Sequence, residues 1–473
     1  MRHFLSAAFV VSLIACGPAR TPVATSSGLA TTEMAITGAT LVDPRSSMST
    51  PDATIILRDG RIACAGPRTD CPVPRGMRSI DLAGKFVTAG LIDAHVHFSQ
   101  TGWIDARPDA IDLRSELAYD STVAMLQQNP APFDRAWLCS GVTAVFDVGG
   151  FPFTIPMARA HETNPLAPRM AAAGPLLTSR AHWLNLPFIQ QFVPMSSDSL
   201  VRSTVSGIAH MSSSAIKVWY LQLPEADRAH AKEMLMIAGQ EAKRAGKPLI
   251  VHATQLPRAK EALEAGTKVL VHSVETAEID DDFIAAAKRN GTIVIPTLTV
   301  REGYGDVGFG RSPAHRYPLE CVDAVTRAKL ERSLPERLRS PLAAAAAPGG
   351  RWDEQRRTMD LNLRKMRDAG IPIAMGTDAG NPGTAHGPSI YREMEAMQAA
   401  GMTAREVLLS STLIAARAMG RESDLGSVDP GKLADLTIFD ADPSVNISNA
   451  RRVHGVVRGG VYYQRAQLLP AAR

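Results

Sequence analysis

Short apolar runs alternate with polar and turn-forming residues along the chain, but their spacing differs between the ends and the middle. From residue 34 to about residue 83, β-like runs are separated by Asp-Gly and Pro-rich turns, a pattern typical of a small sheet. Similar runs return at residues 433–439 and 453–463, with turns at Pro430-Gly431 and Gly459-Gly460. We therefore expect a small β-sandwich domain that is built from both chain ends.

The middle of the chain alternates apolar runs, rich in β-branched residues, with amphipathic stretches long enough for a helix. One such stretch, residues 255–265, carries good helix formers and ends at Gly266. This alternation predicts an α/β fold with a parallel sheet, and the number of units favours a closed (β/α)₈ TIM-type barrel over an open sheet. The apolar runs lie at residues 140–148, 215–220, 249–253, 269–273, 292–297 and 371–376.

These patterns predict the domain boundaries. The barrel is expected over residues 86–422, and the β domain in two parts, residues 34–85 and 423–473. Residues 301–350 break the alternation and are expected to form an insertion over the barrel mouth.

The N-terminus has the order of an export signal. Met1, Arg2 and His3 precede an uncharged, mainly apolar run that ends at Cys16 and is too short to span a bilayer. Because this ending resembles the lipobox of bacterial lipoproteins, we expect a lipoprotein-type signal peptide at 1–16 and a flexible tether at 17–33. The protein is then exported to the periplasm or outer cell surface and lipid-anchored through Cys16. An ordinary cleaved signal with a chance cysteine is the alternative.

Composition and charge narrow the class of protein. With 473 residues, 45% hydrophobic and 21% charged, the chain can bury a large core and is not disordered. Its net charge of +4 (51 − 47) is spread without a block of like charges, so the sequence shows no basic arm for nucleic acid and we expect none as a partner.

Cysteines limit the kinds of metal site and crosslink. The five cysteines form no CxxC pair, so any metal would need His and carboxylate ligands. In an oxidising compartment Cys64 and Cys71 are close enough in sequence for a local disulfide, and two unpaired cysteines are equally compatible with the spacing.

Candidate metal ligands begin with His95 and His97. They follow the apolar run 86–92, and two residues apart on a strand they project from the same face. An HxH pair alone arises by chance in about a third of chains with this His content, so the pair needs further ligands. Such residues stand at or near the ends of later runs: Lys217, His252, His272 and Asp378.

In a barrel, the carboxyl ends of the strands meet on the one face where active sites form. Singly, such a His is more often a core residue, Lys217 a salt-bridge partner and Asp378 a helix cap. As a set, the six side chains predict a metal site.

The order and the sequences of these motifs resemble those of the amidohydrolase superfamily over nearly the whole mature chain. Within it, the sequence is most similar to the imidazolonepropionase-related branch, which includes prolidase-like dipeptidases. The segments that carry the resemblance are residues 90–97, 141–144, 147–150, 376–378 and 426–435, together with Lys217, His252 and His272.

The resemblance implies a role for each residue. His95 and His97 would bind one divalent metal ion, His252 and His272 a second, and a carboxylated Lys217 would bridge the two. Zinc is the default ion for His and carboxylate ligands. Asp378 would be both ligand and proton carrier, and a metal-bridging hydroxide would attack the scissile carbonyl.

The resemblance also implies the reaction. We expect a hydrolase that cleaves an amide or peptide C–N bond in a dipeptide or N-acyl amino acid, working as a homo-oligomer. His182 is a candidate to polarise the carbonyl and Tyr220 to contact a substrate carboxylate, although Val218 and Trp219 separate Tyr220 from the lysine. The alternative is a mononuclear cyclic-imide or imidazolone-type hydrolase, or a deaminase, with Lys217 unmodified.

Overall fold

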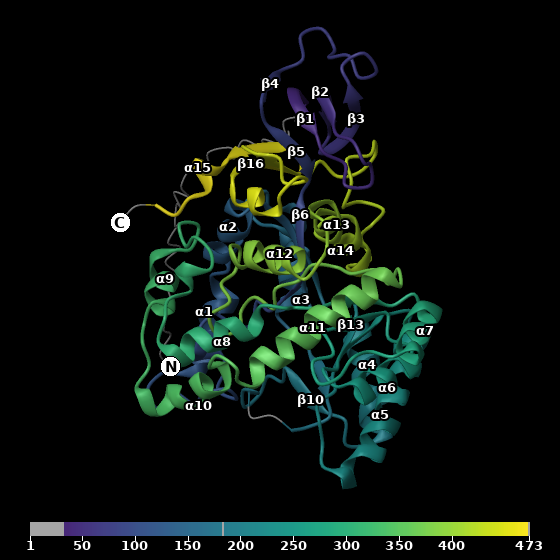
Figure 1. The fold of residues 1–473 in the computed structure, drawn as a ribbon, viewed down its shortest axis with the longest axis vertical. Helices are drawn as coiled ribbons and strands as arrows, with labels where there is room; N and C mark the ends of the chain where they lie inside the picture. The colour runs from purple at the N-terminus through teal and green to yellow at the C-terminus, as the bar shows by residue number, and fades with distance from the viewer. Residues whose placement is uncertain (1–32, 182–183, 472–473) are drawn as a thin grey trace, which may run out of the picture. The chain divides into compact units, whose positions relative to one another are not determined.

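The computed structural model describes residues 33–181 and 184–471, and one of its sheets is built from both chain ends. The strands follow the order β17-β16-β15-β5-β1-β2-β3, and β4 also pairs with β1. In Figure 1 the purple N-terminal strands and the yellow C-terminal strands approach each other around β5. The eight strands are β1 (Met34–Leu41), β2 (Thr50–Arg58), β3 (Arg61–Pro67), β4 (Ser79–Asp81), β5 (Phe86–Ala89), β15 (Leu436–Phe439), β16 (Val453–Arg458) and β17 (Val461–Gln464).

Tight turns separate two pairs of neighbouring strands in this sheet. Asp59 and Gly60 have φ values of 49° and 72°, as a two-residue hairpin turn requires, and they separate β2 from β3. Gly459 and Gly460 do the same between β16 and β17. The sheet contains strands from both chain ends, as expected, but they form one hydrogen-bonded sheet, where we expected the two layers of a sandwich.

The middle of the chain forms two further sheets of parallel strands. A six-stranded sheet has the order β10-β9-β11-β12-β13-β14, and a three-stranded sheet has the order β6-β7-β8. The strands are β6 (Leu91–Val96), β7 (Val142–Asp147), β8 (Arg169–Ala172), β9 (Leu176–Thr178), β10 (Phe192–Pro194), β11 (Ile216–Trp219), β12 (Leu249–His252), β13 (Val269–Val271) and β14 (Ile293–Ile295).

One extended segment, residues 373–379, connects these two sheets. Ile373 forms an isolated bridge with Val294 of β14, and Ala379 forms one with Val96 of β6. The run 371–376 was predicted as a strand, whereas the structure gives it only this single bridge.

Helices follow most of the parallel strands, as the alternating pattern predicted. Residues 255–265 form α6 as expected, and α4 to α7 lie on the right in Figure 1. The helices before residue 300 are α1 (Tyr119–Gln128), α2 (Ala131–Cys139), α3 (Thr154–Thr163), α4 (Asp198–His210), α5 (Glu225–Arg244), α6 (Leu256–Glu264) and α7 (Asp281–Asn290). Those after it are α8 (Val300–Phe309), α9 (Ala324–Leu330), α10 (Glu336–Ala346), α11 (Arg351–Asp368), α12 (Ser389–Ala399), α13 (Ala404–Ser410), α14 (Leu413–Ala418) and α15 (Arg465–Leu468).

The segment that breaks the alternation is helical. Residues 301–350 hold most of α8 and all of α9 and α10, and α8 packs closely on α10. A Cβ atom at Gly308 would lie 2.5 Å from the backbone nitrogen of Ala343, so this approach requires a glycine.

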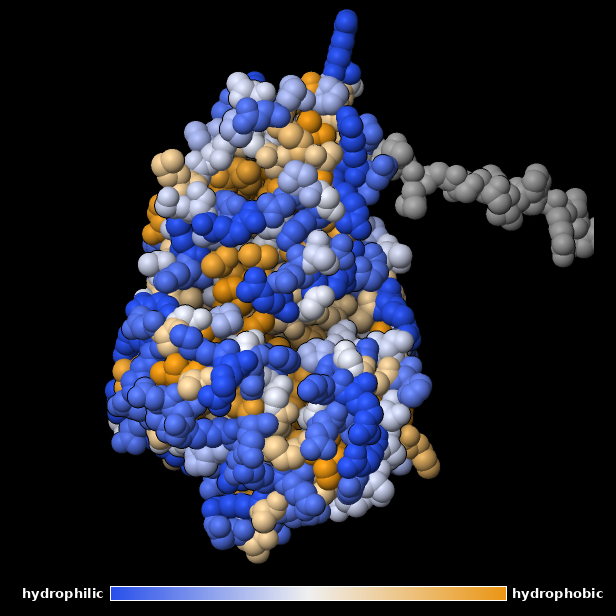
Figure 2. All heavy atoms as spheres, turned by 90° about the vertical axis from the view of Figure 1, so that its right-hand side faces the viewer, coloured by the Kyte–Doolittle hydropathy of each residue, from blue (hydrophilic) through white to orange (hydrophobic). Residues whose placement is uncertain are grey.

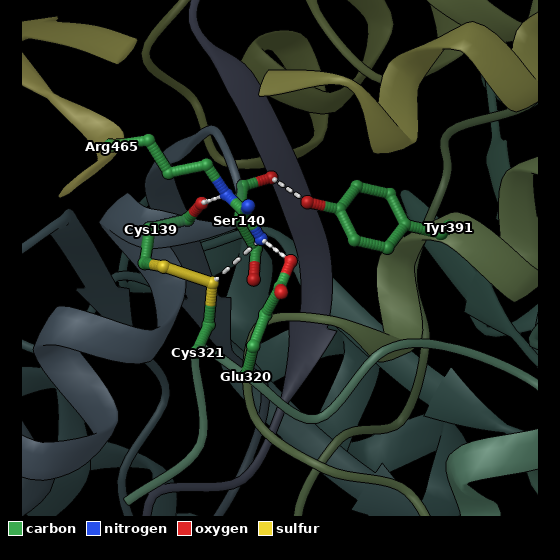
Figure 3. The surroundings of a disulfide bond; sticks show 6 residues. All are labelled: Cys139, Ser140, Glu320, Cys321, Tyr391 and Arg465. Atoms are coloured by element: carbon green, nitrogen blue, oxygen red, sulfur yellow. Dashed lines mark hydrogen bonds and ion pairs between the residues drawn. A yellow bond between two sulfur atoms is a disulfide. The ribbon is translucent and has the colours of Figure 1, made fainter. Parts of the chain in front are cut away.

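Two disulfides crosslink the part of the chain that the structure describes. Cys64 is bonded to Cys71, which settles the alternative that the sequence left open. The second bond joins Cys139, at the end of α2, to Cys321, and the sequence did not predict it. Figure 3 shows Arg465 of α15 beside this bond, where its Nε donates to the Cys139 carbonyl oxygen at 3.2 Å and its guanidinium pairs with Glu320.

The surface is mainly polar on the side that Figure 2 shows, and the hydrophobic residues there form separate patches. Within residues 33–181 and 184–471, none of the helices combines the length and the apolar character needed to cross a membrane. The expected signal peptide, tether and lipid-anchored Cys16 fall on residues 1–33, of which the structure describes only Glu33.

Candidate metal centre

The parallel strands deliver polar side chains to one place. His95 lies on β6 and His97 just after it, Lys217 lies on β11, and His252 is the last residue of β12. His272 follows β13 directly. β11, β12 and β13 pair in parallel, so their carboxyl ends share one edge of the six-stranded sheet. A ring contact between His95 and His272, with 5.0 Å between centroids, brings β6 of the other sheet to that edge.

Asp378 reaches the same edge from the connecting segment 373–379. Its backbone nitrogen donates to the His95 carbonyl oxygen at 2.8 Å. Asp93 of β6 holds this segment in place, since its carboxylate accepts hydrogen bonds from the Thr377 hydroxyl at 2.6 Å and the Thr377 backbone nitrogen at 3.0 Å.

His95, His97 and Asp378 form the tightest part of the cluster. The Nε2 atoms of the two histidines lie 3.3 Å apart, and the Oδ1 atom of Asp378 lies 3.3 Å from one and 3.1 Å from the other. His272 also belongs here, because His95, His272 and Asp378 each offer a ligand atom and these atoms all lie within 4.8 Å of one another.

His252 and Lys217 adjoin this group. The rings of His252 and His272 contact each other at 4.4 Å between centroids, and Lys217 is 3% exposed. The structure therefore brings together all six residues that the sequence singled out, and they line one cavity: His95, His97, Lys217, His252, His272 and Asp378.

Hydrogen bonds to neighbouring groups orient the imidazoles. Nδ1 of His97 donates to the Gly149 carbonyl oxygen at 2.6 Å, and its Nε2 faces Asp378 at 3.1 Å. A 2.6 Å hydrogen bond joins Nδ1 of His272 to the Thr297 hydroxyl. Such partners hold a ring in the orientation that a metal ligand needs.

Left-handed backbone conformations occur at three residues of the site. The φ angles are 70° at His272, 45° at Thr297 and 61° at Asp378, a region that side chains other than glycine seldom adopt. This local strain is a feature of functional sites, where the surrounding structure enforces it.

The protonation states suit cation binding. Burial lowers the pKa of His95, His252 and His272 well below the ordinary value, so these imidazoles are neutral at pH 7. Burial raises the pKa of Asp378, but the hydrogen bond and charge of His97 outweigh it and bring it to about 2. The cluster therefore combines neutral nitrogen donors with an ionised carboxylate.

Lys217 has an unusual pKa for a lysine. Burial lowers it to about 7, against the opposing attraction of Asp378 and Asp147. A large share of the Lys217 side chains is therefore uncharged near neutral pH, which is the form in which an amine is nucleophilic.

The donor set fits a divalent metal ion. Two imidazole nitrogens and a carboxylate oxygen point at one another across about 3 Å, and such lone pairs repel unless a cation or proton lies between them. Nitrogen and oxygen donors of this kind bind zinc and also suit Mn, Fe and Co.

The cavity has room for a small molecule beside the cluster. Its volume is about 360 Å³, in the range of small-molecule sites. Helices α8, α10 and α11 supply part of the wall through Tyr304, Leu342 and Trp352, so the insertion does reach the site. Arg107 contributes a cation, which is ion-paired to Asp109 at 2.8 Å.

The structure describes one of the two predicted substrate residues. Tyr220 is absent from the described residues that line the cavity, and its hydroxyl donates to Glu261 at 2.7 Å and accepts from Arg258 at 3.0 Å. His182 lies outside the described residues. The substrate roles of both stay predictions.

Other lining residues were not identified from the sequence. Arg107, Tyr304 and Asn381 come from loops and from the insertion, where no strand pattern marks them. Asn381 stands three residues after Asp378, and only this proximity to a recognised motif could have drawn attention to it.

The chain is similar to known proteins over most of its length. The model of the amidohydrolase family matches residues 86–462. An imidazolonepropionase from Rhizorhabdus wittichii is 27% identical over 427 residues, which cover 83% of this chain and 88% of that protein.

Solved structures share the fold. A Xaa-Pro dipeptidase with bound methionine in the active site has a TM-score of 0.69 and 23% identity, and covers 91% of this chain and 100% of its own. A prolidase complexed with N-methylphosphonate-L-proline has a TM-score of 0.67 and 20% identity, with coverages of 92% and 100%.

Proposed function

The chain belongs to the amidohydrolase family, and on that premise we propose that it is a metal-dependent hydrolase of amide or peptide C–N bonds in small molecules. The observation that carries the proposal is the meeting of six potential ligands, remote in sequence, at one cavity wall. A structural cluster of histidines would have no need of an adjoining cavity of about 360 Å³.

We propose two ions. His95 and His97 would hold the first and His252 and His272 the second, with Asp378 as a further ligand of the first, because its carboxylate contacts both histidines of that pair. Divalent ions bound here would lower the pKa of water and polarise a substrate carbonyl.

A carboxylated Lys217 would be a ligand of both ions in this proposal. Its uncharged amine attacks CO₂, a C–N bond forms and one proton is released, which leaves a carbamate with two oxygens. The depressed pKa of Lys217 and its burial support this modification, since an ammonium group has no lone pair for the attack.

Asp378 moves the proton. As an ionised carboxylate it accepts a proton from the attacking water and delivers it to the leaving amine. Asp378 thus serves both as a ligand and as the general acid and base of the reaction.

Dipeptides and N-acyl amino acids are the proposed substrates. The ligands named for the solved relatives, methionine and a proline phosphonate, are amino acid derivatives. In this chain Trp219 and Trp352 supply apolar wall and Arg107 supplies a polar group, so the cavity suits an amide with an apolar side chain.

A second candidate is a cyclic amide hydrolase with one metal ion. The imidazolonepropionase relatives favour it, since their resemblance extends over most of the chain. In that case Lys217 stays unmodified.

We also propose that the two sheets and the segment 373–379 form one closed barrel of the (β/α)₈ type. The bridges from Ile373 to β14 and from Ala379 to β6 support closure at that seam. At the other seam, the Ser214 nitrogen donates to the Ala172 carbonyl oxygen of β8 at 2.8 Å, just before β11.

Export remains a proposal based on the N-terminal sequence. The disulfides Cys64–Cys71 and Cys139–Cys321 are compatible with an oxidising compartment. Intact mass of the mature protein would show a lipid on Cys16, and an N-terminus beyond Cys16 would contradict the anchor.

The test of function combines metal analysis with a substrate panel. Purified protein should contain two equivalents of metal per chain, hydrolyse dipeptides or N-acyl amino acids, and lose activity with a chelator. His272→Asn should abolish turnover, while the exposed His230→Asn, on α5, serves as the matched control.

The panel includes cyclic imides to separate the two candidates. One equivalent of metal, cyclic-imide hydrolysis and an active Lys217→Ala variant would establish the mononuclear alternative. No hydrolysis of any amide by metal-loaded protein would refute both.

A further inference from the structure

Asn381 occupies a position between the cavity wall and Asp378. It is 3% exposed and lies in the loop that follows Asp378. Its side-chain nitrogen Nδ2 donates to the Asp378 carboxylate oxygen Oδ1 at 2.7 Å and to the Asp378 carbonyl oxygen at 3.0 Å.

The other atom of the amide contacts two residues of the cavity. Oδ1 of Asn381 accepts a hydrogen bond from the Tyr304 hydroxyl at 2.9 Å and another from the Arg107 guanidinium. Both donors line the cavity. The two donor hydrogens and the two acceptor sites of the amide are therefore all engaged.

The orientation of the amide follows from these partners. A guanidinium can only donate, so the atom of Asn381 that faces Arg107 must be the oxygen. The amide nitrogen then faces Asp378, where a carboxylate can only accept. Flipping the amide would break these interactions, so Arg107 fixes which side of Asn381 is presented to Asp378.

Asp378 needs such a partner because its Oδ1 atom is the one that contacts both histidines. Oδ1 lies 3.1 Å from Nε2 of His97 and 3.3 Å from Nε2 of His95, and it is the same atom that accepts from Asn381. The backbone of Asp378 is in the left-handed region, which is unfavourable for an aspartate, so the surrounding structure must hold the residue in this conformation.

We infer that Asn381 is a positioning residue that holds the Asp378 carboxylate on the metal centre, and that Tyr304 and Arg107 lock it from the substrate side. This inference rests on the proposed function, because it assumes that Asp378 is a metal ligand. Through Asn381, the cavity-lining residues Tyr304 and Arg107 would set the position of Asp378, the proposed proton carrier.

The magnitude follows from similar arrangements in metal sites. Loss of a residue that orients a ligand lowers metal affinity or activity by about 10- to 100-fold. Loss of the Tyr304 hydroxyl alone should cost less, about fivefold, because Arg107 still holds the amide oxygen.

Cobalt titration tests the inference without a known substrate. Co²⁺ added to metal-free protein gives visible absorption bands that report affinity and ligand geometry. Asn381→Leu, which keeps the size and removes all four hydrogen bonds, should weaken Co²⁺ binding by about 10- to 100-fold and change the bands. Asn449→Leu is the matched control, since Asn449 donates to the Asp442 carbonyl oxygen at 2.8 Å and does not line the cavity.

A second variant guards against misfolding. If Asn381→Leu fails to fold by circular dichroism, Asn381→Ala decides the question by the same titration. On a dipeptide that the wild type hydrolyses, kcat of the variant should fall while KM changes little. A general loss of structure would instead change both kcat and KM.

The outcomes separate this inference from the proposed function. Wild-type Co²⁺ affinity and bands in a folded Asn381 variant would overturn the positioning role and leave the hydrolase proposal intact. Failure of the wild type to bind Co²⁺ would refute the metal centre itself, and the role of Asn381 with it.

Discussion

At the scale of single residues, burial determines which groups carry charge. Burial keeps His95, His252 and His272 neutral, whereas Asp378 is ionised despite its burial because His97 lies beside it. Burial has a different effect away from the site, where a carboxyl group lacks such partners.

Asp134 on α2 is the clearest case. It is 2% exposed, its Oδ1 atom has no hydrogen-bond partner among the described residues, and Nε2 of His161 lies 3.4 Å away. Burial raises the pKa of Asp134 to about 8 and lowers that of His161 to about 4, so both groups are neutral at pH 7.

Because of the raised pKa of Asp134, the free energy of unfolding should fall as the pH rises. An aspartate in the unfolded chain ionises near pH 4, so between about pH 4 and pH 8 the native state binds a proton that the unfolded state has lost. The contribution is fully present below about pH 4 and lost as the pH rises through about 8.

Asp134→Asn removes this dependence, because an amide does not ionise. We expect the variant to match the wild type at pH 4 and to exceed it by a few kcal/mol at pH 8, since each pKa unit corresponds to about 1.4 kcal/mol. Denaturant unfolding at both pH values is the measurement, and parallel pH profiles for the two proteins would contradict the raised pKa.

At the scale of elements, the apolar runs of the sequence correctly predicted several of the buried parallel strands. β11, β12 and β13 appear within the expected runs, and the first two deliver Lys217 and His252 to the site. The prediction succeeded there because a buried parallel strand must be apolar along its length, so a polar residue at its end is conspicuous.

Other elements carry no such signal. β8, β9 and β10 contain at most one β-branched residue each, whereas β11, β12 and β13 contain two each. The strand expected at 371–376 forms only one bridge. The cavity wall from α8 and α10 depends on how helices pack, which neither composition nor local pattern specifies.

Helix α8 approaches the loop beside Asn381 very closely. A Cβ atom at Gly303 would lie 2.4 Å from the Pro382 carbonyl oxygen and 2.8 Å from the Thr384 hydroxyl. Gly303→Ala should push α8 and its Tyr304 away from the cavity, which lowers activity and costs about 1–3 kcal/mol of stability.

Gly207→Ala is the matched control on α4. Nothing lies within 4 Å of a Cβ atom there, so alanine should stabilise the helix by about 0.5–1 kcal/mol. Thermal unfolding and turnover of both variants test the contact, and equal behaviour would show that α8 can shift at no cost.

At the scale of the whole molecule, crosslinks join segments that are remote in sequence. Cys139–Cys321 closes a separation of 182 residues, whereas Cys64–Cys71 closes one of 7. Loop closure restricts the unfolded chain more strongly when the loop is long.

The double variant Cys139→Ala/Cys321→Ala should therefore lose more stability than Cys64→Ala/Cys71→Ala. On the chain-entropy model we expect losses of about 5 kcal/mol and about 2.5 kcal/mol. Denaturant unfolding of each variant beside the wild type gives the comparison, and a larger loss for the short loop would contradict this explanation.

The strand order of the composite sheet has a consequence for how the protein is made. β15 lies between β5 and β16, so the edge of β5 stays open on the ribosome until residues 436–439 have been synthesised. A nascent chain that stops before them already contains every site residue, including Asp378, but exposes an unpaired β-edge that invites aggregation. Premature termination near the end of the message should thus yield insoluble product that chaperones must clear, and no partly active enzyme.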